Sequence, residues 1–336
     1  MSHSNLSVAK PAESSQGTHS IKNLPINLFG SVMGLAGLSL AWRLASPGLS
    51  EASIFGENLA EFIGMLSALV FVLLAVGYTS KWIKHPEAVK AEFSHPVTGN
   101  FFGTVTIALL LLSAIAMSYS TLLGQVIWAV GSGLTVLLAA VVVFRLLSGG
   151  REAQLAVPAW LIPGVAALDI AVTGAHMPMA WAHELNLFAI AMGSTLAVVL
   201  FNRIFARLIH EPAMAKGMTP SLMVMVAPFA VGFLAYVNVF GAVDRFASVL
   251  FYFGLFLFVV LAFKVFRNAA PFSPVWWSIS FPIAALSNAA LKYADAQQSL
   301  FLSLVAYGLL VFLTLALAVM LVKTVKMALD GRLLAS

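Results

Sequence analysis

The chain has 336 residues, of which 61% are hydrophobic and only 9% are charged, and its mean hydropathy is +0.97. This composition excludes a water-soluble globular protein, which must present a polar surface to solvent. The absence of cysteine excludes disulfides, thiolate catalysis and cysteine-held metal or iron–sulfur clusters. The sequence therefore predicts an integral membrane protein.

Apolar runs of about 20 residues recur along almost the whole chain, and a helix of that length crosses a hydrocarbon core roughly 30 Å thick. The runs are continuous and do not alternate between apolar and polar positions, so helices are predicted rather than the strands of a β-barrel. The predicted fold class is all-α, with ten transmembrane helices. Their predicted extents are residues 26–45, 56–80, 100–120, 122–147, 156–176, 184–209, 221–240, 245–266, 274–294 and 299–322.

Polar segments flank these runs. Residues 1–25 are predicted to form a disordered cytoplasmic tail, because no apolar core of a signal peptide precedes Leu24. Residues 26–322 form the predicted transmembrane domain, and residues 323–336 are predicted to be a second, short cytoplasmic tail. We expect no soluble catalytic or regulatory domain.

The loop charges predict the orientation of the chain, because Lys and Arg are retained on the cytoplasmic side of a membrane. With the N-terminus inside, 15 basic residues lie on the cytoplasmic side, and three, Arg43, Arg245 and Lys292, lie outside. Both termini are therefore predicted to be cytoplasmic, which requires an even number of crossings. The net charge of +5 follows largely from this asymmetry and does not indicate nucleic-acid binding.

Helix-breaking residues are concentrated in the odd-numbered predicted crossings, and no proline interrupts an even-numbered one. Three of the crossings contain prolines: the fifth has Pro158 and Pro163 with Gly164, the seventh has Pro220 and Pro228, and the ninth has Pro274 and Pro282. The other two contain glycines: the first has Gly30, Gly34 and Gly37, and the third has Gly99 and Gly103.

A proline inside a helix removes a hydrogen bond and leaves carbonyl groups that lipid cannot satisfy. The odd-numbered helices are therefore expected to kink and to face inward around a pore, in five helix hairpins whose even-numbered helices lie outside. The alternative explanation is that membrane helices tolerate proline and glycine, and use small residues for close packing.

One face of the predicted ninth helix carries a polar stripe. Positions three or four residues apart share a helix face, and here they hold Ser278, Phe281, Ala285, Asn288 and Lys292. If this face lines a pore, Phe281 is its bulkiest obstacle, and Lys292 lies about 16 Å further along the axis, close to the outer boundary. Alternatively, Phe281 packs against a neighbouring helix and Lys292 extends its ammonium group to the lipid headgroups.

Asp169 lies in the outer half of the predicted fifth crossing, where a carboxylate is costly and is a functional candidate. Three interpretations remain open. The carboxylate forms an ion pair with Lys292 or Arg245, it is the protonatable site of a proton-coupled carrier, or it is a neutral acid that donates a hydrogen bond.

Two stretches match a known family, WWSISFP at residues 276–282 and GSVMGLAGLSLAW at residues 30–42. Weaker matches are SHPVTGNFF at residues 94–102 and VMVAPFAVGFLAY at residues 224–236. The sequence resembles the SLAC/TehA family, which includes plant slow anion channels, bacterial tellurite-resistance TehA proteins and dicarboxylate transporters. The resemblance covers most of the chain.

This resemblance implies a homotrimer in which each protomer has its own pore through the odd-numbered helices, closed by a phenylalanine. By position that gate is Phe281. Pore-lining or helix-kinking residues are then Gly30, Gly34, Pro163, Pro228, Ser278, Pro282, Ala285 and Asn288, with Lys292 and Asp169 at the outer mouth. The resemblance also implies that small inorganic anions pass, with nitrate preferred to chloride. No Lys or Arg lies deep in an odd-numbered crossing, so we expect weak anion sites at helix termini.

The other polar residues do not show the residue types and spacing of an enzyme active site or a metal site. None of the seven histidines suits a membrane haem, and interfacial solvation explains His176, His183 and Glu184 better than a surface metal site. There is no phosphate-binding glycine loop, catalytic carboxylate pair or HExxH motif. We expect no catalytic residue, no metal, no cofactor and no nucleic-acid partner.

Together these features predict a passive, Phe-gated anion channel in the lipid bilayer of a bacterial inner (plasma) membrane, assembled as a homotrimer. The alternative is a proton-coupled carrier or exporter of dicarboxylates or oxyanions such as tellurite, with Asp169 as the coupling residue. A membrane enzyme or redox subunit is a third hypothesis.

Overall fold

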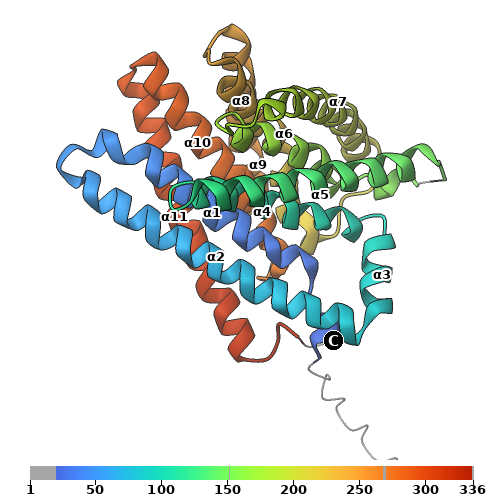
Figure 1. Ribbon diagram of the computed structural model, residues 1–336. Helices are drawn as coiled ribbons and strands as arrows, with labels where there is room; N and C mark the ends of the chain where they lie inside the picture. The colour runs from blue at the N-terminus through green and yellow to red at the C-terminus, as the bar shows by residue number, and fades with distance from the viewer. Residues whose placement is uncertain (1–19, 151, 268–269, 335–336) are drawn as a thin grey trace, which may run out of the picture.

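The computed structural model describes residues 20–150, 152–267 and 270–334, and this part of the chain is built from helices without any strand (Figure 1). Within these residues, eight helices are long and apolar enough to cross a membrane, and Pro158–Gly174 is a shorter apolar helix. The predicted all-α, multi-pass membrane protein is confirmed.

The ends of the chain depart from the predicted boundaries. Most of the predicted N-terminal tail, residues 1–19, lies outside the described residues. Within the tail predicted over residues 1–25, however, Ile21–Asn23 form a 3₁₀ turn, η1, and Leu24 is buried. At the other end, α11 (Leu300–Leu329) continues seven residues beyond the predicted end of the last crossing at residue 322. The two segments also contact each other, with Asn23 Nδ2 donating to the Leu334 carbonyl at 3.0 Å.

Long, proline-free helices form the outside of the bundle. They are α2 (Ser53–Lys84), α5 (Thr121–Leu147), α7 (Ala180–His210), α9 (Arg245–Arg267) and α11. Much of their surface is exposed, and only 22% of the most apolar window of α2 is buried. The exposed side chains include Phe62, Leu73, Phe144, Phe256 and Leu315. Apolar surface of this extent suits contact with lipid chains rather than water.

Shorter helices form the inside. They are α1 (Phe29–Ala45), α4 (Phe102–Ala116), α6 (Ile162–Gly174), α8 (Ala227–Phe240) and α10 (Ser280–Gln297). They pack in a closed ring in the order α1, α4, α6, α8, α10 and back to α1, and each also packs against the long helix that follows it in the chain. Figure 1 shows α1 and α4 near the centre of the bundle, with α2 outside α1. The five shorter helices therefore form a buried ring, and the long helices pack around it.

Each helix of this ring is preceded by a 3₁₀ segment. The segments are η2 (Ile26–Leu28), η4 (Thr98–Phe101), η6 (Pro158–Leu161), η7 (Lys216–Val226) and η8 (Pro274–Ile279). A 3₁₀ helix rises about 2 Å per residue, so these segments lengthen the short α-helices. Only one further short helix, α3 (Pro86–Ser94), precedes η4 in the connection between α2 and α4 among the described residues.

Three of the ring prolines lie at the change from 3₁₀ to α-helix, whereas Pro158 and Pro274 begin 3₁₀ segments and Pro220 lies inside one. Pro163 and Pro228 are at the beginning of α6 and α8, and Pro282 is the third residue of α10. In the first turn of a helix the backbone N–H has no intrahelical partner, so a proline there costs no hydrogen bond. These prolines start the α-helical segments and do not interrupt them, unlike the mid-helix kinks that the sequence predicts.

The glycines of the first ring helix allow close packing, in agreement with the alternative explanation above. α1 is continuous from Phe29 to Ala45. A Cβ atom on Gly34 would lie 2.5 Å from Cβ of Ser280, and one on Gly37 would lie 2.7 Å from Cβ of Ala284. The absence of side chains at these glycines therefore lets α1 lie directly against α10.

A buried ion pair lies beside the segment that precedes α1. Lys81 Nζ of α2 lies 2.6 Å from Glu92 Oε2 of α3, and only 5% of the lysine side chain is exposed. Glu92 also accepts hydrogen bonds from the Tyr78 hydroxyl at 2.8 Å and from the Ile26 backbone N–H at 3.1 Å. Lys81 donates a further bond to the Leu24 carbonyl at 2.8 Å. Because Ile26 begins η2, these contacts attach the segment before α1 to α2 and α3.

Candidate functional site

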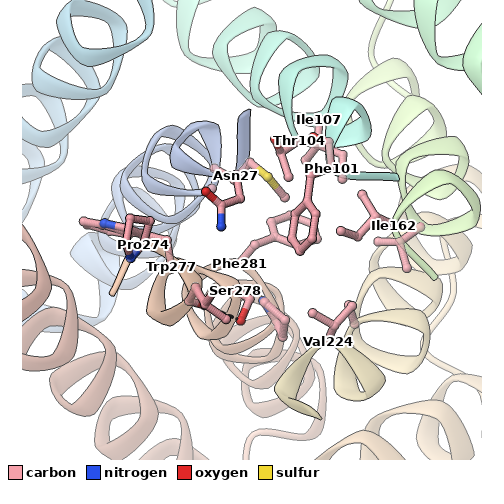
Figure 2. Close-up of a pocket in the computed structure, with 16 residues that line it drawn as sticks. Asn27, Phe101, Thr104, Ile107, Ile162, Val224, Pro274, Trp277, Ser278 and Phe281 are labelled. Atoms are coloured by element: carbon pink, nitrogen blue, oxygen red, sulfur yellow. Dashed lines mark hydrogen bonds between the residues drawn. The ribbon is translucent and has the colours of Figure 1, made fainter. Parts of the chain in front are cut away.

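The ring of α1, α4, α6, α8 and α10 encloses two cavities. We call the first the helix-start chamber, because the 3₁₀ segments and first turns of the ring helices line it (Figure 2). Its volume is about 30 Å³, enough for a water molecule but too small for an open passage. Its lining residues are Asn27, Gly30, Met33, Phe101, Thr104, Ile107, Ile162, Val165, Val224, Ala227, Pro274, Val275, Trp277, Ser278, Phe281 and Pro282.

The second cavity, the helix-end chamber, is lined by the later turns of the same helices and has a volume of about 210 Å³. It contains charged and polar side chains, whereas the helix-start chamber has none that is charged. Its lining residues are Gly37, Leu40, Arg43, Leu44, Leu111, Ala114, Asp169, Val172, Thr173, His176, Leu234, Asn238, Phe281, Ala285, Asn288 and Lys292.

Both chambers lie along the same faces of the ring helices. Each helix contributes to the two chambers residues that are seven positions apart, which are Gly30 and Gly37, Thr104 and Leu111, Val165 and Val172, Ala227 and Leu234, and Phe281 and Asn288. Seven residues make about two helical turns and rise about 10 Å, so such pairs project from nearly the same side of a helix. The chambers are therefore stacked along the axis of the ring.

Phe281 separates the two chambers. It is the one residue that both linings share among the described residues. Its side chain is buried, with 6% of its surface exposed. Figure 2 shows the ring of Phe281 in the middle of the lining side chains, with Ile162 opposite. A passage along the axis of the helix ring would therefore have to pass this aromatic ring.

Two hydrogen bonds hold the α10 backbone and the α1 backbone together beside Phe281. The single hydrogen of the Ser280 hydroxyl is shared between the Gly30 carbonyl of α1 at 2.9 Å and the Trp277 carbonyl at 2.7 Å, and Asn288 Nδ2 donates to the Gly37 carbonyl at 2.9 Å. Asn288 Nδ2 also donates to the Ala284 carbonyl at 2.8 Å. These bonds fix the rotation of α10 against α1, and so they fix the direction in which Phe281 projects.

Polar groups of the helix-start chamber are mostly satisfied locally. The Thr104 hydroxyl donates to the Phe101 carbonyl at 2.6 Å, and the Ser278 hydroxyl donates to the Val275 carbonyl at 2.7 Å. The exception is Asn27, whose Oδ1 atom is buried without a hydrogen-bond partner. The space around Phe281 on this side is thus predominantly apolar.

Cationic side chains of the helix-end chamber are held by neutral partners. Lys292 Nζ donates to Asn238 Oδ1 at 2.7 Å, and Asn238 Nδ2 donates to the Val172 carbonyl at 2.7 Å. Arg43 donates from Nη1 to the Ser118 hydroxyl at 2.5 Å. Neither contact supplies a negative charge, so no acidic partner in these contacts cancels the positive charge that could attract an anion.

Asp169 also lines the helix-end chamber, and it has no ionic partner. Only 1% of its surface is exposed, and its Oδ2 atom has no hydrogen-bond partner. The ion pairs within the described residues are Lys81 with Glu92 and Arg332 with Asp330. Among the described residues Asp169 forms no ion pair with Lys292 or Arg245, which was the first of the three interpretations left open by the sequence, and Lys292 donates to the Asn238 amide on α8 instead.

The predicted site residues are only partly brought together. Gly30, Ser278 and Pro282 line the helix-start chamber, and Ala285, Asn288, Lys292 and Asp169 line the helix-end chamber. Gly34, Pro163 and Pro228 line neither chamber, although they shape the helices that do.

Sequence reasoning missed several lining residues, namely Asn27, Arg43, Thr104, Thr173 and Asn238. Asn27 and Asn238 are each a single amide in an apolar run, which is a signal that the sequence does contain. The described residues contain no group of three or more His, Asp or Glu that could hold a metal ion.

Comparison with known proteins places the chain in a family. Residues 23–325 match the SLAC1 family, which is described as voltage-dependent anion channel. The chain is similar to the S-type anion channel SLAH2 of Arabidopsis thaliana, with 28% identity over 81% of this chain and 53% of the relative. It is also similar to the guard cell S-type anion channel SLAC1 of the same plant, with 28% identity over 81% of this chain and 50% of the relative.

A bacterial relative aligns over most of both chains. The tellurite resistance protein TehA homolog of Haemophilus influenzae is 25% identical over 87% of this chain and 90% of the relative. By contrast, this chain spans about half the length of the plant channels named above. Since the family match extends over nearly the whole transmembrane part of the sequence, this protein belongs to the SLAC1 family of anion channels and TehA-like transporters.

Proposed function

We propose that this protein is a passive anion channel whose pore runs through the two chambers and is closed by Phe281. The observation that carries this proposal is that Phe281 alone is shared by two cavities stacked along one ring of helices. Rotation of its side chain, or a small outward movement of α10, would join the chambers. No step of such a mechanism needs a cofactor.

The channel consists of ten membrane crossings arranged as five hairpins in this proposal. Each hairpin pairs a ring helix with the long helix that follows it, as their packing supports. The ninth crossing is η8 with α10, whose residues from Ser280 to Leu291 are all buried. Because its neighbours shield it from lipid, α10 can carry Asn288 and Lys292, whose side chains donate to protein acceptors.

Anion preference arises from two sources. The ring helices begin around the helix-start chamber, so the positive ends of their dipoles lie near an apolar space without any charged lining residue. Arg43 and Lys292 add full positive charges to the helix-end chamber. Dipoles in an apolar chamber bind anions weakly and favour those that lose water easily, so nitrate is preferred to chloride.

The helix-end chamber faces the outside, and both termini face the cytoplasm. This orientation follows from the excess of Lys and Arg at the other end of the crossings. The protein resides in a bacterial inner membrane as a homotrimer with one pore in each protomer. The exposed apolar surfaces of the outer helices supply the area for contacts with lipid and with neighbouring protomers.

The test is the current carried by Phe281→Ala after reconstitution into planar bilayers with nitrate or chloride. Removal of the ring should raise anion conductance at least about tenfold over the parent protein, and reversal potentials should follow the nitrate and chloride gradients. Phe233→Ala is the matched control, because Phe233 is a fully buried phenylalanine on α8 that lines neither chamber. This control should leave the current at the parent level.

An unchanged current in folded Phe281→Ala would contradict the gate. Equal currents in Phe281→Ala and Phe233→Ala would show a leak caused by loosened packing. A reversal potential that shifts with pH at fixed anion gradients would indicate a proton-coupled carrier instead of a channel.

A further inference from the structure

A basic pocket lies outside the two chambers, at the ends of α7 and α9. Its cations are Arg207 in the last turn of α7, Lys264 and Arg267 in the last turn of α9, and Lys216 at the start of η7. The volume of the pocket is about 880 Å³, and Glu211 is the one carboxylate among its described lining residues. Within the described residues, none of these four cations lies within ion-pair distance of a carboxylate.

Arg207 is the buried element of this pocket. It is 8% exposed, and its Nε atom donates to the Gln154 carbonyl at 3.2 Å. Its Nη1 atom, however, is buried without any hydrogen-bond partner. A guanidinium carries N–H donors on each nitrogen, and leaving them unsatisfied inside a protein is costly. Arg207 therefore brings to the pocket a positive charge that no carboxylate of the described residues neutralises.

A phosphate group has the chemistry to bind among these lining cations. Its oxygens accept the paired N–H donors of a guanidinium, and its charge offsets those of the surrounding cations. Apolar side chains, Leu208, Met214, Leu222 and Pro271, also line the pocket. A ligand with a phosphate attached to apolar chains matches both kinds of lining.

We propose that this basic pocket binds the phosphate of an anionic phospholipid headgroup. The pocket lies at the end of two long helices whose neighbouring side chains, Ile209 and Phe263, are apolar and more than 60% exposed, as expected for residues beside lipid. Arg267 extends over the ring of Phe263, with its guanidinium carbon 5.4 Å from the ring centre. Basic pockets between membrane helices on the cytoplasmic side are suited to anionic headgroups. The site is independent of whether the helix ring conducts anions.

Native mass spectrometry of the full chain in detergent tests this inference. Phosphatidylglycerol, phosphatidylcholine and inorganic phosphate are added separately. The parent protein should retain phosphatidylglycerol and not phosphatidylcholine. Each basic residue at a membrane surface contributes a several-fold increase in affinity for anionic lipid, so the double variant Lys264→Gln/Arg267→Gln should bind at least about tenfold more weakly. Both of its altered residues are exposed, so this variant should fold.

The matched control is Lys84→Gln/Lys90→Gln, which removes two exposed cations from the α2–α3 region, away from the basic pocket. Its binding should equal that of the parent. Arg207→Gln should weaken binding as well, and the Lys264→Gln/Arg267→Gln variant decides the question if Arg207→Gln fails to fold. If the parent protein retains inorganic phosphate, and if this phosphate competes with phosphatidylglycerol, the pocket is a site for free phosphate. Equal binding by the parent and Lys264→Gln/Arg267→Gln, or no binding by the parent, would overturn the proposal.

Discussion

Lys292 of α10 and Asn238 of α8 are joined by a hydrogen bond of 2.7 Å from the ammonium group to the amide oxygen. The amide of Asn238 in turn donates to the Val172 carbonyl near the end of α6. Three ring helices thus meet through one amide, which orients the lysine without neutralising it. An amide serves this purpose better than a carboxylate, because a carboxylate would cancel the charge that attracts anions.

Replacement of Lys292 by Gln should therefore reduce anion current. In the Phe281→Ala background, where the gate no longer limits conduction, we expect a two- to fivefold lower nitrate conductance at low salt. The difference should shrink at molar salt, because ions screen the charge of an accessible lysine. Arg245→Gln is the control, since Arg245 is exposed at the start of α9 and lines neither chamber. An equal loss of current in both variants would argue against a specific role for Lys292.

Asn238→Leu tests the positioning of that lysine. The leucine cannot accept the bond from Nζ or donate to the Val172 carbonyl, so Lys292 loses its orientation but keeps its charge. We expect anion conductance in the Phe281→Ala background to fall less than in Lys292→Gln, while the dependence on salt remains. A loss larger than that of Lys292→Gln would show that Asn238 itself contacts the permeating ion.

Asp169→Asn should stabilise the protein. The carboxyl group is buried without an ionic partner, so folding must either bury its negative charge or protonate it, and Asn removes this cost while keeping nearly the same shape. The free energy of unfolding should increase by about 1 kcal/mol or more. Thermal unfolding in detergent measures the change, with Asp295→Asn at the exposed end of α10 as the control. A lower melting temperature for Asp169→Asn would mean that the carboxylate has a stabilising partner in the folded protein.

The contact between α1 and α10 should be sensitive to one added methyl group. In Gly37→Ala the new Cβ would lie 2.7 Å from Cβ of Ala284, so the two helices must separate. Overpacking of this kind costs about 1–3 kcal/mol. Gly133→Ala on α5 is the matched control, because nothing lies within 4 Å of its added Cβ. This control should be neutral or slightly stabilising, and equal melting temperatures for the two variants would contradict the close packing of α1 on α10.

Glu92→Gln should loosen the segment that precedes α1. Without the carboxylate, the buried ammonium group of Lys81 loses its counter-charge, and breaking a buried pair in this way costs about 3 kcal/mol. Glu87→Gln in the same short helix is the control, since Glu87 is exposed. Hydrogen exchange should be faster at the Ile26 amide in Glu92→Gln, because that N–H bonds to Glu92 at 3.1 Å. Unchanged exchange at Ile26 would show that the ion pair does not hold η2.

Much of the fold could be predicted because it depends on properties that lie along the chain. Continuous apolar runs specify helices for a bilayer, and the burial of alternate helices follows from where prolines and glycines occur. The spacing of Ser278, Phe281 and Ala285 on one helix face is local as well. All three prove to line the chambers. The boundaries near the chain ends were less predictable, because hydropathy does not report contacts between distant segments, such as that of Asn23 with Leu334.

The tertiary structure alone decided which groups meet. Lys292 and Asp169 both line the helix-end chamber, yet the lysine bonds to Asn238 and the carboxylate to no cation. That outcome depends on how α6, α8 and α10 are rotated about their axes. The rotation is set by packing between distant segments, such as Gly37 against Ala284, and hydropathy does not encode it. The sequence by itself therefore determined a helical membrane protein with a polar stripe, and the packing of the helices decided that Phe281 separates two chambers.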